Sequence, residues 1–262
     1  MSTTTTTTPA QPLSGRTAIV TGSSRGIGRA IAVHLASLGA DLVINYASNA
    51  AKAESLANEL NGPGGRIRAI AVQANISVSQ DIDVLFDRAE AAFGRQAHVL
   101  VNCAGVLDPK YAHIANTSEA DWDMTLSVNT KGAYLCCKAA ASRLTTGGGG
   151  RIVMITSSVI GLNRPGYGAY TASKAAVEAM VRVLAKELKG TGITANCVAP
   201  GPIATELFYE GKSEAVVAGI AEACPLGRIG EPGDVAPVVG FLVGDSGEWV
   251  NGQVVRVNGG MV

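Results

Sequence analysis

A tyrosine and a lysine in the second half of the chain have the residue types and the spacing of a proton-transfer pair. Tyr170 and Lys174 lie four residues apart in a stretch, residues 169–188, whose composition predicts a helix. Side chains at this spacing leave the same face of a helix, one turn apart. An ammonium near a phenol stabilises the phenolate, so we expect it to lower the pKa of Tyr170 from the usual value of about 10. Such a tyrosine can give a proton to a carbonyl oxygen or take one from an alcohol.

A pair of serines, Ser157 and Ser158, lies shortly before the tyrosine, after a predicted strand at residues 152–155. A hydroxyl at this position could hold the reacting oxygen while the tyrosine transfers the proton. A tyrosine and a lysine four residues apart also occur on exposed helix faces, so the interpretation depends on the elements that surround them.

The composition excludes several classes of protein. Lys+Arg and Asp+Glu balance at 21 each, so no overall basic field would recruit nucleic acid or an anionic membrane. No apolar run approaches the ~20 residues of a membrane-spanning helix. The five cysteines show no paired C-x-x-C spacing, and the three histidines are scattered. We therefore predict buried free thiols in a reducing compartment, with neither a disulfide framework nor a metal site.

Residues 1–12 are rich in threonine and contain proline, without the apolar core of a secretory signal. We expect a disordered tail followed by a single domain over residues 13–262. The tail has no arginine before Arg16, which favours a cytoplasmic protein over the alternative of plastid targeting.

Short β-branched runs alternate with helical patterns along the rest of the chain. Strands are predicted at residues 17–20, 42–44, 67–72, 99–101, 152–155, 193–198 and 254–257. Helices are predicted at residues 27–38, 51–60, 80–93, 129–143, 169–188 and 235–242, with a helical excursion over 207–223. A further helix is predicted to be capped by Ser118 and to run through Trp122 and Met124. Continuous apolar strands between helices indicate an α/β fold, a doubly wound, Rossmann-like parallel sheet with helices on both faces.

A glycine-rich loop lies between the first predicted strand and the first predicted helix. Its glycines, Gly22, Gly26 and Gly28, allow a sharp turn and the close approach of a pyrophosphate to a helix N-terminus. The spacing departs from the commoner Gly-x-Gly-x-x-Gly, but the position in a βαβ unit predicts a dinucleotide site.

The residues around this loop favour NADP(H) over NAD. The second strand is followed by residues 45–49, which contain no carboxylate to hold both ribose hydroxyls. Arg25 within the loop can pair with a 2′-phosphate, the alternative being a solvated loop cation.

The motifs together resemble the short-chain dehydrogenase/reductase family. They are the glycine loop, Asn102-Cys103-Ala104-Gly105, Asn129, the serine pair and Tyr170-x-x-x-Lys174, in one order and at matching spacings. The resemblance covers residues 13–262 and is closest to NADPH-dependent carbonyl or aldehyde reductases and β-ketoacyl carrier-protein reductases.

The resemblance implies a role for each matching residue. Tyr170 would be the general acid/base, Lys174 would bind the nicotinamide ribose and tune the tyrosine, and Asn129 would kink its helix and anchor a relay water. The implied cofactor contacts are Gly22, Ser24, Arg25, Gly26, Ile27, Gly28, Tyr46, Ala47, Ser48, Asn75, Ile76, Asn102, Ala104, Gly105, Tyr170, Lys174, Pro200, Gly201, Ile203 and Thr205. Asn75 stands where the family usually has an aspartate.

Two ways of counting select different serines. The family's serine commonly lies about thirteen positions before the tyrosine, which selects Ser157. It also lies three residues before a glycine, and Gly161 then selects Ser158. Because loops vary in length more readily than strand-end motifs, we predict Ser158 as the carbonyl-orienting hydroxyl, with Ser157 pointing the other way.

A lid over residues 203–223 is expected to close a pocket for a small, mainly apolar carbonyl compound. The predicted pocket residues are Leu107, Ser158, Val159, Leu162, Tyr167, Phe208 and Tyr209. Lys212 is the basic residue that stands out in the lid, which disfavours an acidic carrier protein as substrate bearer.

Three functions fit this pattern. The first is an NADPH-dependent carbonyl reductase, the second a 3-oxoacyl carrier-protein reductase, and the third a non-catalytic NADP-binding sensor, which predicts decay of the tyrosine, lysine and serine set. By resemblance, the helices around Asn129 and Tyr170 are expected to build a homodimer or homotetramer.

Overall fold

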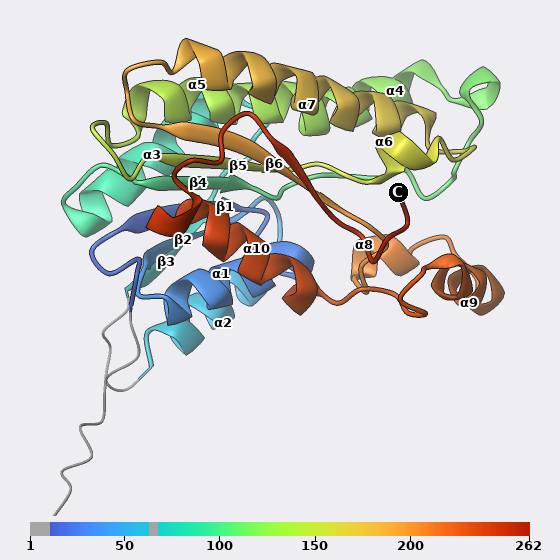
Figure 1. The fold of residues 1–262 in the computed structure, drawn as a ribbon, viewed down its shortest axis with the longest axis horizontal. Coiled ribbons are helices and arrows are strands. Elements are labelled where there is room, and N and C mark those ends of the chain that lie inside the picture. Colours follow the sequence, from blue (N-terminus) through green and yellow to red (C-terminus); the bar gives the residue numbers. More distant parts are fainter. Residues whose placement is uncertain (1–10, 63–67) are drawn as a thin grey trace, which may run out of the picture.

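A parallel β-sheet forms the centre of the chain in the computed structural model, which describes residues 11–62 and 68–262 (Figure 1). Within these residues the sheet has seven strands in the order β3-β2-β1-β4-β5-β6-β7. The strands are β1 (Thr17–Thr21), β2 (Asp41–Tyr46), β3 (Ala69–Gln73), β4 (Val99–Asn102), β5 (Arg151–Ile155), β6 (Thr194–Pro200) and β7 (Val254–Val257). The chain winds outward from β1 to β3 and then returns to β4 beside β1. This arrangement confirms the doubly wound, Rossmann-like fold.

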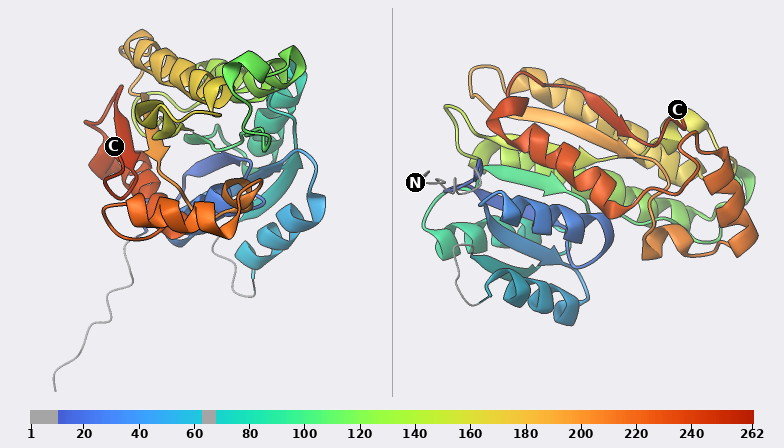
Figure 2. Two further views of the ribbon diagram at one scale, coloured as in Figure 1. Left: turned by 90° about the vertical axis from the view of Figure 1, so that its right-hand side faces the viewer. Right: turned by 60° about the horizontal axis from the view of Figure 1, so that its bottom comes forward.

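Helices cover both faces of the sheet (Figures 1 and 2). One face carries α1 (Gly26–Ser37), α2 (Ala50–Leu60) and α10 (Pro232–Val243). The other carries α3 (Ser79–Phe93), α5 (Ala133–Arg143) and α7 (Gly168–Glu187). Because helices shield both faces, β1, β4, β5 and β6 are buried throughout and read as continuous apolar or β-branched runs.

The segments between these helices are less regular than the sequence suggests. The helix predicted from Ser118 is α4 (Glu119–Leu126), and the side chain of Ser118 caps it as expected. The helix predicted at 129–143 begins with a π-helical turn, η2 (Ser127–Gly132), before α5 starts. A short helix, α6 (Val159–Leu162), follows β5, and single 3₁₀ turns lie at η1 (Ile114–Asn116) and η3 (Asp245–Gly247).

The excursion predicted over 207–223 is two helices, α8 (Glu206–Tyr209) and α9 (Glu214–Ala223). Gly211 separates them with a left-handed φ of +72°, and a Cβ there would lie 2.5 Å from the carbonyl oxygen of Pro109. The side chain of Ser213 then caps α9 by accepting a hydrogen bond from the amide of Val216.

Two expectations fall partly outside the described residues: the tail over residues 1–10, and the breaker at 63–65 with the start of the strand predicted at 67. Elsewhere in the described chain the five cysteines are free, and Cys136, Cys137, Cys197 and Cys224 are buried. Among the same residues, no helix has the length and apolar character to cross a membrane, and no group of histidines, cysteines and carboxylates could hold a metal ion.

The core between α3 and the sheet gives a direct test of this packing. Phe86 is fully buried, and the guanidinium of Arg143 lies 5.3 Å from its ring centre. Phe86→Ala should lower the free energy of unfolding by about 3–5 kcal/mol, because it removes apolar contacts and leaves a cavity. Val84, on the same helix, is 48% exposed, so Val84→Ala should change it by no more than about 0.5 kcal/mol. Urea unfolding followed by circular dichroism measures both; equal effects would contradict the described orientation of α3.

Candidate active site

The glycine loop forms a tight cradle between β1 and α1. Gly22 and Gly26 have left-handed φ values of +61° and +55°. A Cβ on Gly22 would lie 2.7 Å from the Cα of Ala104, and one on Gly28 would collide with the carbonyl oxygen of Gly22. Only glycine fits these positions. The cradle therefore leaves the amides at the start of α1 open to an anion, as the diphosphate of a dinucleotide requires.

The turn after β4 is organised from β1. The hydroxyl of Thr21 donates to the side-chain oxygen of Asn102 at 2.7 Å and accepts from the amides of Cys103 and Ala104, each at 3.1 Å. Asn102 is buried by this contact and does not line the cleft. The side chain of Asn102 thus secures the strand ends, and its expected contact with the cofactor stays a prediction.

Cations lie at the mouth of the cradle. Arg25 forms an ion pair with Glu206 of α8, and Lys52 of α2 donates to the same carboxylate at 2.7 Å. These charged hydrogen bonds lower the pKa of Glu206. The segment after β2, residues 45–49, presents no carboxylate, so the mouth of the cradle can receive a further anion beside Arg25.

A cleft of about 590 Å³ runs from the cradle across the carboxyl ends of the strands. Every residue expected to contact the cofactor lines it, apart from Asn102. The lining includes Gly22, Ser24, Arg25, Gly26, Ile27, Gly28, Tyr46, Ala47, Ser48, Asn75, Ile76, Ala104, Gly105, Tyr170, Lys174, Pro200, Gly201, Ile203 and Thr205. Its position matches the crevice in which doubly wound sheets bind nucleotides. The donor set and the glycine cradle thus fit a dinucleotide.

Tyr170 and Lys174 both face this cleft from the first turns of α7. The ammonium nitrogen of Lys174 lies 5.8 Å from the centre of the Tyr170 ring and donates to the carbonyl oxygen of Ile155 at 2.8 Å. A Cβ on Gly105 would approach both this nitrogen, at 3.3 Å, and the side-chain oxygen of Asn129, at 3.2 Å. The missing side chain at Gly105 lets the lysine and the asparagine come close together.

Without a bound cofactor, burial has a larger effect on the pKa of Tyr170 than the charge of Lys174 has. Burial raises the pKa of Tyr170 to about 12, while the hydroxyl of Ser157, as hydrogen-bond partner of the phenol, acts in the opposite direction. Burial likewise lowers the pKa of Lys174 to about 8. The lowering of the Tyr170 pKa expected from Lys174 beside a bound ribose stays a prediction; in the protein alone, desolvation disfavours the charged forms of both residues.

Asn129 holds the π-helical turn η2 against two neighbours. Its side-chain oxygen accepts from the amide of Val106 at 2.8 Å, and its amide group donates to the carbonyl oxygen of Val106 at 2.8 Å and to the hydroxyl of Ser173 at 3.1 Å. The wide turn and these bonds agree with the expected break in the helix at this residue. Asn129 itself is buried and does not line the cleft.

The two serines after β5 are placed in the reverse of the predicted way. Ser157 lines the cleft beside Tyr170. Ser158 is buried, donates to the carbonyl oxygen of Ala199 at 2.8 Å and accepts from the amide of Asn258 at 3.0 Å. The assignment of Ser158 to the pocket is therefore wrong. Its amide also bonds to the carbonyl of Pro200, so the continuation of β5 along β6 turns this hydroxyl away from the cleft.

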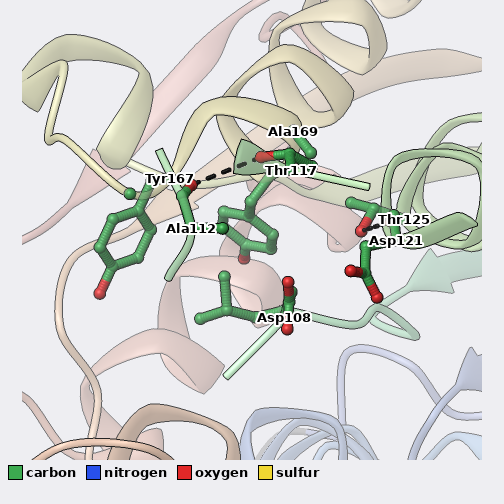
Figure 3. A pocket seen from close by; sticks show the side chains of 10 residues that line it. Asp108, Ala112, Thr117, Asp121, Thr125, Tyr167 and Ala169 are labelled. Carbon is green, nitrogen blue, oxygen red and sulfur yellow. Dashed lines mark hydrogen bonds between the residues drawn. The ribbon is translucent and has the colours of Figure 1, made fainter. Parts of the chain in front are cut away.

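The far end of the cleft contains most of the expected pocket residues, namely Leu107, Val159, Leu162, Tyr167 and Phe208. Tyr209 does not line it; this residue is largely exposed and meets Phe208 edge-on at 5.2 Å. A recess of about 20 Å³ adjoins Tyr170, with Tyr167 on one side and Asp121 and Thr125 on the other (Figure 3).

Comparisons with known proteins agree with this geometry. A family model described as enoyl-(acyl carrier protein) reductase matches residues 22–262. A short-chain type dehydrogenase/reductase of Picea abies is 55% identical over 254 residues, covering 95% of this chain and 93% of the relative. The chain belongs to the short-chain dehydrogenase/reductase family.

Two further similarities lie within this family. An NADPH-dependent aldehyde reductase-like protein, chloroplastic, of Arabidopsis thaliana is 62% identical over 261 residues, with 97% of each chain covered. The crystal structure of a short chain dehydrogenase from Burkholderia cenocepacia in complex with NADP superposes with a TM-score of 0.87 at 35% identity, covering 95% of this chain and 99% of the other.

Several residues of this short-chain dehydrogenase/reductase site were not expected from the sequence. Cys103 lines the cleft, and burial raises the pKa of its thiol to about 12. Arg164 lines the far end together with Lys212. Arg164 lies between α6 and α7 and precedes a proline. This sequence predicts a turn but does not predict that the arginine faces the lid.

The buried ammonium of Lys174 predicts a pH-dependent contribution to stability. Its pKa in the folded protein, about 8, lies below the value of about 10.5 expected when unfolded, so burial of the charge is unfavourable below pH 8. This penalty disappears as the pH rises from 8 to 10.5. The stability of Lys174→Met relative to the wild type should therefore fall by on the order of 1–3 kcal/mol between these pH values.

Urea unfolding at a series of pH values measures this difference. Lys186→Met is the matched control, since Lys186 lies on the same helix with an exposed side chain. A stability difference for Lys174→Met that does not change with pH would contradict the burial of a charged amine.

Proposed function

We propose that this oxidoreductase uses NADPH to reduce the carbonyl group of a small, mainly apolar aldehyde or ketone to an alcohol, with Tyr170 as proton donor. The observation that carries the proposal is the meeting of Tyr170, Lys174 and Ser157 in one cleft that begins at a glycine cradle. The intact set argues against a non-catalytic NADP-binding sensor.

Several features support NADPH as the cofactor. The Arabidopsis relative is named NADPH-dependent, and the Burkholderia neighbour was solved with NADP. In this chain, the glycine cradle would hold the diphosphate, Arg25 and Lys52 would face the 2′-phosphate, and Lys174 would face the ribose nearer the reaction. When bound, the reduced nicotinamide supplies a hydride, which brings two electrons to the carbonyl carbon.

Tyr170 gives its proton to the carbonyl oxygen as the carbon–oxygen π bond breaks, and later regains one from solvent. Burial keeps the phenol of Tyr170 protonated in the protein alone, and the charge of Lys174 beside a bound ribose would bring its pKa nearer the working pH, as a general acid requires. Ser157 is within hydrogen-bond reach of the phenol, so its hydroxyl can hold the same oxygen and stabilise the developing alkoxide. Asn129 supports this group indirectly, through Ser173 and Val106.

The proposal also includes the oligomeric state of the protein and its location in the cell. Tyr134 of α5 and Val183 of α7 are exposed apolar side chains on the helices expected to pair, which supports a homo-oligomer. A cytoplasmic location stays a prediction, and the plastid, named for the Arabidopsis relative, is its competitor.

Removing the phenol hydroxyl should separate binding from turnover. Tyr170→Phe should keep the affinity for NADPH, measured by fluorescence titration, and lose at least about 100-fold in kcat, because the proton donor is gone. Turnover is measured by the loss of NADPH absorbance with a panel of substrates that contains simple aldehydes, diketones and acetoacetyl thioesters. A strong preference for the thioesters would favour the 3-oxoacyl carrier-protein reductase instead. Full activity of Tyr170→Phe would refute the assigned acid.

Replacing each serine by alanine in turn tests which hydroxyl holds the reacting oxygen. Ser157→Ala should lower kcat by roughly 100-fold with little change in stability, because it removes a hydrogen bond made at the reacting oxygen. Ser158→Ala should destabilise the fold by about 1–3 kcal/mol, because Asn258 loses a buried partner. Turnover per folded molecule should fall far less for Ser158→Ala than for Ser157→Ala. The opposite ranking in kcat, with stability measured in parallel, would restore Ser158 as the reacting hydroxyl.

A further inference from the structure

Two basic side chains line the cleft at the end remote from the glycine cradle. Arg164 lies in the connection between α6 and α7, and Lys212 lies in the connection between α8 and α9. Figure 1 shows α6, α8 and α9 at one end of the molecule, beyond the carboxyl ends of the strands. The positive charges therefore lie on the substrate side of Tyr170.

A single loop residue brings these two connections together. Tyr111, with a left-handed φ of +48°, packs against Gly166 and Gly211, and neither glycine leaves room for a side chain beside it. Its ring lies 5.1 Å from that of Tyr167, and its hydroxyl donates to the carbonyl oxygen of Glu210 at 2.9 Å. Arg164 thus lies against the ring of Tyr167 and Lys212 against the ring of Tyr111.

The ammonium of Lys212 lies among neutral groups. It donates to the hydroxyl of Tyr111 and, at 2.5 Å, to the carbonyl oxygen of Phe208, and it lies 4.5 Å from the Tyr111 ring centre. Burial lowers its pKa to about 8, and the charge of Arg164 acts in the same direction. Lys212 therefore lies within reach of the positive charge of Arg164.

In the described part of the chain, neither cation forms an ion pair. Of the nearby carboxylates, Glu206 is held by Arg25 and Lys52, and Asp121 by Lys110, while Glu210 is close enough to act on the pKa of Tyr111 without forming an ion pair. The guanidinium of Arg164 lies 6.0 Å from the centre of the Tyr167 ring. Two neighbouring cations that line a cleft without a carboxylate partner favour an anionic ligand, whose charge would relieve their repulsion.

We propose that Arg164 and Lys212 form an anion subsite and that the preferred substrates are carbonyl compounds with a carboxylate at the end remote from the carbonyl. The inference rests on the proposed carbonyl reductase function and names its substrate class. The carboxylate would accept hydrogen bonds from the fork of Arg164 and from the remaining proton of Lys212. The apolar lining between this subsite and Tyr170 would contact the carbon chain of the substrate.

The test compares a homologous series of ω-oxoalkanoates with their neutral methyl esters, using NADPH and the wild-type enzyme. At the best chain length the carboxylate should have a kcat/KM at least about tenfold above its ester, mainly through a lower KM. Arg164→Gln should reduce this ratio to about threefold or less, and Arg164→Lys should restore part of it. The ratio is the readout because a general loss of activity affects acid and ester alike.

Arg88→Gln is the matched control. Arg88 is exposed on α3, away from the cleft lining, so its loss changes the net charge equally but should leave the ratio unchanged. Lys212→Met tests the second cation, and the ratio of kcat/KM for the acid to that for its ester should also fall in this variant. Equal kcat/KM values for acids and esters at every length, or a preference that survives in both Arg164→Gln and Lys212→Met, would overturn the subsite while leaving the carbonyl reductase standing.

Equilibrium binding separates the subsite from the proposed reaction. Calorimetric titration of the corresponding ω-hydroxyalkanoates and their methyl esters into the protein–NADPH complex should show about tenfold tighter binding of the carboxylates, lost in Arg164→Gln. If no aldehyde is reduced, the proposed function fails, and this titration still supports or overturns the subsite.

Discussion

The site depends on a buried ammonium that a backbone carbonyl holds in place. Lys174 extends from α7 to the end of β5, where the carbonyl oxygen of Ile155 accepts a hydrogen bond from its ammonium at 2.8 Å. A side chain at Gly105 would crowd both this nitrogen and Asn129, so the turn after β4 must be bare. The strand ends, the π-helical turn and α7 therefore meet around one charge. Burying it is unfavourable for folding, and such costs are typical of residues that a site retains for chemistry.

Much of the cofactor half of the site follows from local sequence. The cradle from Gly22 to Gly28 lies between a strand and a helix that are adjacent in the chain, so its shape is determined within a few residues. Continuous apolar runs predicted the sheet because helices cover both of its faces. Because the cradle and the strand ends follow from this local pattern, nearly all the residues expected to contact the cofactor line the cleft. The exception is Asn102, whose side chain is hydrogen-bonded to Thr21.

The substrate half was less predictable because it depends on contacts between distant segments. Two counts along the sequence selected different serines, and the pairing of the chain after β5 with Ala199 and Pro200 decides in favour of Ser157, the one counted back from Tyr170. The pKa of Tyr170 depends on how deeply α7 is buried, which spacing alone does not give. The nearness of Arg164 to Lys212 arises from a loop wedged between their segments.

The last residues of the chain pack behind the active site, against Ser158, α6 and the lid, and do not line the cleft. Asn258 donates to the hydroxyl of Ser158, and Val262 packs against Gly161 of α6, close to the point where the C-terminus is marked in Figure 1. Gly259 lies against the sulfur of Cys224, behind the lid. An affinity tag fused after Val262 would thus crowd the segment that backs Ser158 and the lid, whereas a tag inserted on the far side of the sheet would leave that segment undisturbed.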